Sequence, residues 1–298
     1  ERWDVSIQLW MEENEFFGCD VQYQEDDYAW AKPLPLDKED LLLHLSEIDP
    51  EERVRQSSAF KMYNALKELA DEMTFAGRPV EIVPPGSSTH GIFTKAAEIR
   101  GLEQICVDMY DAPDFVDKLL HLVTEKNIAR IKAWHKLTTG LDLQLPLAEG
   151  FHFCDDSLQL ISTEMYERFV LPCHERLYSA MTAGKRRMHL CGRSSQHYHT
   201  LRHKLNVTAI DGPSPFVDHG QYLRELGPDF SFVAQTDHSV LANGSESQID
   251  EMLRGLLSNE AKIPGRFQVM GFVTRHTPLR NVEICYQAGR KYGAIGQD

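Results

Sequence analysis

The stretch RRMHLCGRSSQHYHTLRHKLNVTAIDG, residues 186–212, contains two short apolar runs separated by a segment rich in histidine. RRMHLCG (186–192) and VTAIDG (207–212) both end in polar or turn-forming residues, as buried parallel strands do where they meet a loop. Between them, His199 and His203 are four residues apart, a spacing that places two side chains on one face of a helix. The stretch therefore predicts a strand, a helix and a second strand.

The same alternation continues along the chain. Further buried strands are predicted at VEIVPPG (80–86), FSFVAQ (230–235) and FQVMGF (267–272). Helices are predicted at 111–134, where Pro113 lies near the first turn, and at 244–258. Ser245 and Gln248 have the spacing of a capping box.

Alternating strands and helices indicate an α/β protein, and we expect one (β/α)8 TIM barrel over residues 1–298. A doubly wound sheet is the competing fold, but no G-x-G-x-x-G follows any strand, and the phosphate-binding G-x-x-x-x-G-K-[ST] pattern is missing from the sequence. The chain opens ERWDVSIQLW without an initiator Met, so we expect that an N-terminal piece is lacking.

Composition excludes several classes of function. The formal net charge of −14 over 298 residues argues against binding to nucleic acid or to an anionic membrane. The sequence has no apolar run long enough to span a bilayer. None of its six cysteines forms a C-x-x-C pair, which is typical of reduced thiols in a cytoplasmic protein.

In a TIM barrel the chemistry lies at the carboxyl ends of the strands, where His189 and Cys191 fall. Residues i and i+2 of an extended strand point to the same side, so the imidazole and the thiol converge. These two ligand types suit Zn²⁺. The alternative is a buried cysteine beside a hydrogen-bonded histidine.

Acidic residues follow other strands. Asp155 and Asp156 in FHFCDDS could complete a metal site, act as acid and base, or lie in a solvated loop that caps a helix. Asp237 and His238 pair a carboxylate with a titratable base, which suits catalysis. Asp211 is a candidate for substrate binding, although a turn contact is the favoured explanation from the sequence.

Many segments, in order, resemble the uroporphyrinogen decarboxylase superfamily. Those that carry the resemblance are STHGIFTKAAEIRGLEQICVDMYDAPDFVDKLL, CDDSLQLISTEMYERFVLPCHERL, MHLCG, VTAIDG, LRELGPDFSFVAQTDHSVLANGSESQIDEMLRGLLS and FQVMGFVTRHTPLRNVEICYQAGRKYG. They lie between residues 80 and 293, with a fainter likeness over 20–50. The resemblance implies a (β/α)8 barrel.

The resemblance also implies one of two chemistries. The corrinoid-linked methyltransferases of this superfamily hold zinc through His-x-Cys and a later Cys, and they transfer a methyl group between methylcobalamin and a thiol. His189 and Cys191 match that His-x-Cys, so we expect a zinc methyltransferase with Asp155 as a further zinc ligand and Asp156, Asp237 and His238 as catalytic residues. The expected partners are a corrinoid protein, a small thiol or methyl donor, and a second copy of the chain.

One position departs from this pattern, because Phe272 follows Gly271 where the family's later Cys is expected. Cys285 is the one cysteine after that point, and it falls on the packed face of a predicted helix. The alternatives are a metal-free decarboxylase, with Arg193 and Arg275 binding substrate carboxylates, or a binding protein that has lost the chemistry.

Overall fold

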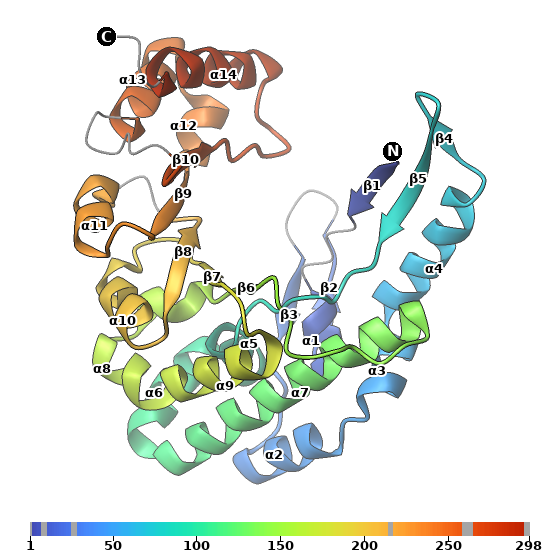
Figure 1. The fold of residues 1–298 in the computed structure, drawn as a ribbon. Helices are drawn as coiled ribbons and strands as arrows, with labels where there is room; N and C mark the ends of the chain where they lie inside the picture. Colours follow the sequence, from blue (N-terminus) through green and yellow to red (C-terminus); the bar gives the residue numbers. More distant parts are fainter. Residues whose placement is uncertain (1, 7–10, 25–28, 214–216, 258–264, 295–298) are drawn as a thin grey trace. The chain divides into compact units, whose positions relative to one another are not determined.

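The computed structural model describes residues 2–6, 11–24, 29–213, 217–257 and 265–294. The chain divides into two compact units (Figure 1). The first comprises Glu1–Phe153 and Glu164–Gly184, and the second comprises Cys154–Thr163 and Lys185–Asp298. The expectation that residues 1–298 form a single domain stays a prediction.

The first unit consists mainly of helices. They are α1 (Glu12–Phe17), α2 (Lys38–Glu47), α3 (Pro50–Gln56), α4 (Ser58–Ala70), α5 (Ile92–Arg100), α6 (Leu102–Asp111), α7 (Pro113–Thr139), the π-helical turn Tyr166–Val170 and α9 (Leu171–Met181); α8 (Thr163–Met165) begins at the last residue of the second unit's first segment. The long helix α7 begins at Pro113, as the sequence predicted, and ends at Thr139, after which Gly140 adopts the left-handed conformation. Its apolar face, including Leu119, Leu120 and Val123, is fully buried.

The strands of the first unit are short. They are β1 (Trp3–Ser6), β2 (Asp20–Gln22), β3 (Trp30–Lys32), β4 (Thr74–Phe75), β5 (Arg78–Val83) and β6 (Phe151–Cys154), whose last residue belongs to the second unit. β5 lies between β1, which is parallel to it, and β4, which is antiparallel. β2 and β3 form an antiparallel pair. The strand predicted near 80–86 is therefore confirmed as β5.

Buried charges hold α1 and α7 together. Arg130 is fully buried, and its guanidinium contacts Glu12 at 2.5 Å and Glu13 at 3.3 Å. The Trp134 indole N–H donates to Glu12 at 2.5 Å. Burial raises the pKa of Glu12, whereas at Glu13 the effect of burial is outweighed by Arg130 and Lys95, which lower the pKa. These carboxylates are stable in the core only while the cations stay beside them.

The second unit alternates strands and helices. Its elements are the 3-10 turn Asp156–Leu160, β7 (Arg186–His189), the 3-10 turn Ser195–His197, α10 (Tyr198–His203), β8 (Val207–Asp211), α11 (His219–Glu225), β9 (Ser231–Gln235), α12 (His238–Asn243), α13 (Glu246–Leu256), β10 (Phe267–Met270) and α14 (Leu279–Gly293). The capping box of Ser245 and Gln248 is present at the start of α13. This order confirms the strands and helices predicted for this part of the sequence.

The sheet of the second unit places the site. β7, β8, β9 and β10 lie side by side and pair in parallel (Figure 1), so their carboxyl ends lie at one edge. His189, the last residue of β7, is in register with Asp211, the last residue of β8. Interior residues such as Met188, Ile210 and Ala234 are fully buried, which explains the apolar runs.

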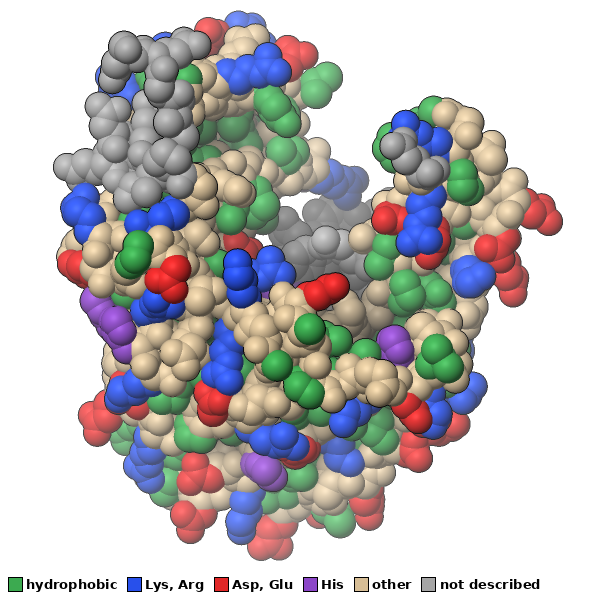
Figure 2. Space-filling view, in the orientation of Figure 1, with side chains coloured by type: hydrophobic (Ala, Val, Ile, Leu, Met, Phe, Trp, Pro, Cys, Tyr) green, Lys and Arg blue, Asp and Glu red, His purple; other side chains and the backbone are tan. Residues whose placement is uncertain are grey.

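Two further observations concern the surface and the helices. Acidic and basic side chains are interspersed over the face shown in Figure 2. No helix among the described residues combines the length and apolar character that crossing a membrane requires.

Candidate metal centre

His189 is held at the end of β7 by a neighbouring carboxylate. Its Nδ1 lies 2.7 Å from Oδ2 of Asp211, because the parallel register places the two residues opposite each other. Only 16% of the His189 side chain is exposed. In a neutral histidine whose Nδ1–H donates to a carboxylate, the Nε2 lone pair is the one that can bind another partner.

The other ring nitrogen faces Cys191. Nε2 of His189 lies 3.0 Å from Sγ of Cys191, so the two side chains converge as the i, i+2 spacing predicted. β7 itself ends at His189, and Cys191 lies just beyond it. The convergence therefore extends past the regular strand.

Asp156 completes the group. Its Oδ1 accepts the backbone N–H of Cys191 at 2.8 Å and lies 3.7 Å from Nε2 of His189. One ligand atom each from Asp156, His189 and Cys191 lies within 4.8 Å of the others, and among the described residues this is the group of three or more that could hold a metal ion. Asp156 begins the 3-10 turn that follows β6, which brings it to the same edge.

Two glycines make room for side chains at this edge of the sheet. Gly212 has φ +84°, and a Cβ there would lie 2.4 Å from Cε1 of His189. Gly192 has φ +68°, and a Cβ there would lie 2.0 Å from Oε1 of Gln159. Any other residue at 212 would collide with the imidazole, which gives the Asp-Gly at the end of VTAIDG a role that sequence reasoning missed.

The electrostatics of the group favour a cation. Burial alone would lower the pKa of His189, but hydrogen bonds to Asp211 and Cys191 and the charge of Asp156 raise it to about 10. The negative potential that Asp211, Cys191 and Asp156 create around the ring is the cause. The same potential would attract a divalent metal ion.

The donor set fits zinc. Imidazole nitrogen, thiolate sulfur and carboxylate oxygen are the ligand types that Zn²⁺ binds in proteins. The contact between Asp211 and Nδ1 supplies the outer carboxylate that a zinc-bound histidine usually has. Three protein ligands leave a fourth position for a substrate, as in catalytic zinc sites.

The structure brings Asp156 rather than Asp155 to His189 and Cys191. The backbone N–H of Asp155 donates to the carbonyl of His189 at 3.1 Å, so Asp155 continues the strand pairing, and its side chain is fully buried. Asp156, the next residue, begins the 3-10 turn, and its Oδ1 lies on the side of His189 and Cys191. Asp155 lies outside that group, and its role as a ligand stays a prediction.

Asp237 and His238 begin a helix. The Asp237 carboxylate accepts the N–H groups of Ser239 and Val240, as an N-cap does. The His238 ring lies against Phe272, with 5.8 Å between ring centroids. Both residues lie near the carboxyl end of β9, and their predicted catalytic role stays a prediction.

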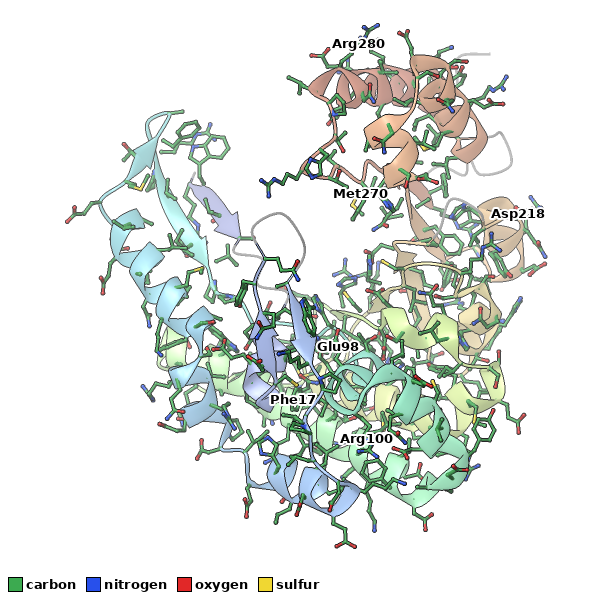
Figure 3. All side chains as sticks on the ribbon, turned by 180° about the vertical axis from the view of Figure 1, so that it is seen from behind. Phe17, Glu98, Arg100, Asp218, Met270 and Arg280 are labelled. Atoms are coloured by element: carbon green, nitrogen blue, oxygen red, sulfur yellow. The ribbon has the colours of Figure 1, made fainter. Side chains whose placement is uncertain are left out.

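The arginines predicted to bind substrate lie on the surface. Arg193 and Arg275 are exposed and follow β7 and β10 respectively. The backbone N–H of Arg193 donates to Gln159 at 3.3 Å. Arg280 lies on the outer side of α14 (Figure 3) and pairs with Glu246 at 3.4 Å. Substrate binding by Arg193 and Arg275 stays a prediction.

The other histidines of the stretch 186–212, and Cys285, have other partners. His199 and His203 do share a face of α10, with their rings stacked at 5.9 Å, and Nε2 of His199 lies 3.0 Å from Glu225. His197 Nε2 lies 2.9 Å from the carbonyl of Leu158. Cys285 packs against the apolar cluster of α12, α13 and α14, as the helical spacing predicted.

Comparisons with known proteins agree with this architecture. A family model described as Uroporphyrinogen decarboxylase (URO-D) matches residues 10–292. A methyltransferase from Methanosarcina mazei is similar in structure, with a TM-score of 0.66 at 14% sequence identity over 98% of this chain and 81% of the other. No curated protein matches significantly. These matches confirm the predicted TIM-barrel-like α/β fold.

Proposed function

Because the chain belongs to the uroporphyrinogen decarboxylase family, we propose that it is a zinc-dependent methyltransferase that moves a methyl group between a corrinoid and a thiol or similar acceptor. The observation that carries the proposal is the convergence of Asp156, His189 and Cys191, with one ligand atom each within 4.8 Å of the others. The structural likeness to a methyltransferase supports it. The methyl donor would be methylcobalamin, carried on a partner protein.

Asp156 Oδ1, His189 Nε2 and Cys191 Sγ would hold the zinc ion. When bound there, zinc would stabilise an acceptor sulfur as the thiolate at neutral pH, which a free thiol does not reach. Asp156 is 42% exposed, so an acceptor can approach this side of the group from solvent.

The chain's own residues would orient the acceptor and take its proton. One oxygen of Asp156 is engaged by the Cys191 N–H, and the second can accept the proton that an incoming thiol releases. The sulfur would then bond to the methyl carbon of the corrinoid substrate while the carbon–cobalt bond breaks, and the electron pair of that bond would stay on cobalt. Asp237 and His238 would contact substrate near the same sheet edge.

Elemental analysis tests the metal site. We would measure zinc per chain in protein purified without chelator, in the parent, in Cys191→Ala and in Cys106→Ala. Cys106 lies on α6 in the first unit, so its substitution is a matched control. About one zinc per chain is expected in the parent and the control, and much less in Cys191→Ala. Absence of zinc from all three would reject the proposal.

A second pair of variants tests which carboxylate binds. Asp156→Asn should lose zinc, whereas Asp155→Asn should keep it. If both variants retained zinc equally, Asp156 would not be a ligand.

An activity assay tests the proposed reaction. Methyl transfer from methylcobalamin to small thiols would be followed by the absorbance change of the corrinoid. Turnover of a porphyrinogen by metal-free protein would instead favour the decarboxylase alternative.

A further inference from the structure

The hydrogen bond between Asp211 and His189 determines which ring nitrogen can serve as a ligand. A neutral imidazole carries one proton, and only its unprotonated nitrogen binds a metal. Oδ2 of Asp211 lies 2.7 Å from Nδ1, and a carboxylate can only accept a hydrogen bond there. A proton is therefore held on Nδ1, and Nε2, 3.0 Å from Sγ of Cys191, is the nitrogen that would give up its proton and bind the metal.

Asp211 itself is fixed by the backbone on both sides. Its carbonyl accepts the N–H of Leu190 at 2.9 Å, and the N–H of the next residue, Gly212, donates to Val233 at 3.0 Å. These bonds tie the end of β8 to β7 and to β9. The carboxylate is consequently presented from a rigid part of the sheet rather than from a mobile loop.

Gly212 completes the arrangement. A Cβ at this position would lie 2.4 Å from Cε1 and 2.7 Å from Nδ1 of His189, so a larger residue would push the imidazole away from Asp211. The positive φ of +84° also favours glycine. The pair Asp211–Gly212 thus sets both the hydrogen bond and the free space around the ring.

We propose that Asp211 is a positioning residue that, with Gly212, presents Nε2 of His189 to a divalent metal of the zinc class. This inference rests on the proposed function. It assigns to Asp211 a role different from the substrate binding expected from the sequence, because Oδ2 is already engaged by the imidazole. Asp211 would act on the metal only through His189.

Metal affinity measures this role. We would titrate Zn²⁺ and Co²⁺ against a chromophoric chelator in the parent, in Asp211→Asn and in Asp229→Asn. Asp229 pairs with Arg202 on the surface of the same unit, so its substitution controls for the loss of one carboxylate. Asp211→Asn should bind metal about 10- to 100-fold more weakly, and Asp229→Asn should match the parent. Equal affinity in both variants would overturn the proposal.

The Co²⁺ spectrum separates positioning from ligation. At saturating Co²⁺, Asp211→Asn should keep the sulfur-to-cobalt charge-transfer band, because Cys191 still binds the ion, whereas Cys191→Ser should lose it. Loss of the band in Asp211→Asn at full occupancy would contradict a purely positioning role.

Two glycine variants isolate the steric contribution. Gly212→Ala and Gly227→Ala introduce a Cβ at similar backbone angles, with φ +84° and +97°. The Cβ at 227 would meet no atom closer than 3.7 Å, whereas the one at 212 would strike His189. Only Gly212→Ala should lose metal affinity. The same loss in Gly227→Ala would attribute it to backbone strain.

Nitrogen-15 NMR of metal-free protein tests the hydrogen bond without any metal. The parent should show a downfield Nδ1–H proton that disappears in His189→Gln and in Asp211→Ala. If the resonance persists in Asp211→Ala, Asp211 does not position the ring. If the parent binds no metal but this resonance behaves as expected, the proposed function fails while the contact between Asp211 and His189 stands.

Discussion

His219 makes the stability of the second unit depend on pH in a measurable way. It is the first residue of α11, is only 4% exposed, and packs against the rings of Phe232 and Phe267 at 5.5 Å and 5.3 Å. Its buried Nε2 has no hydrogen-bond partner among the described residues. Burial lowers the pKa of His219 from 6.5 to about 4, and the nearby Asp218 only partly opposes this effect.

The direction of this pH dependence follows from the protonation of His219 in the folded and the unfolded protein. Between pH 6.5 and 4 the unfolded chain protonates this histidine and the folded chain does not, so acid favours unfolding. The contribution is complete above pH 6.5 and is lost as the pH falls towards 4. At about 1.4 kcal/mol for each pH unit, the loss approaches about 3 kcal/mol by pH 4.

Urea unfolding of the parent and of His219→Leu measures this contribution. Leucine has no titrating group and suits the apolar surroundings. The free energy of unfolding should fall more steeply in the parent between pH 6.5 and 4, by about 1.4 kcal/mol per pH unit, while other titrating groups cancel in the difference. Parallel curves, or an NMR titration that finds His219 protonated near pH 6.5, would refute the reasoning.

Other predictions concern buried charge, a helix cap and the late cysteine. Arg130→Met should lower the free energy of unfolding by about 3–5 kcal/mol, because Glu12 is left buried without its cation; the double variant with Glu12→Gln should cost less than the sum of the singles in urea unfolding. Asp237→Ala removes the N-cap of α12 and should cost about 1 kcal/mol by thermal unfolding, and unchanged stability would show that the cap contributes little. Cys285→Ala should keep the zinc content of the parent, because this thiol packs in the core; zinc loss would make it a ligand.

Much of the second unit could be predicted from the sequence. The runs at 207–212, 230–235 and 267–272 are strands because their apolar residues are buried in a parallel sheet. The capping box before α13 is a local pattern with a local cause. By contrast, β1, β2, β3 and β4 are two to four residues long and mostly exposed, so they leave no periodic signal.

The candidate site was predictable only in part. The spacing of His189 and Cys191 indicated their convergence, since side-chain direction along a strand is a local property. Choosing between Asp155 and Asp156 required knowing where β6 ends relative to β7. The local sequence around these two residues does not contain that information. The structure groups Asp156 with His189 and Cys191, whereas the sequence had suggested Asp155 as the ligand, and that role of Asp155 stays a prediction.

The sequence by itself therefore determined the order of strands and helices in the second unit, the pairing of imidazole with thiol, and the departure at Phe272. Only the tertiary structure decided that Asp211 holds His189 and that Gly212 makes space for it, because both depend on the register between β7 and β8. Register results from the packing of many side chains across the sheet, and 21 residues separate these partners in the chain.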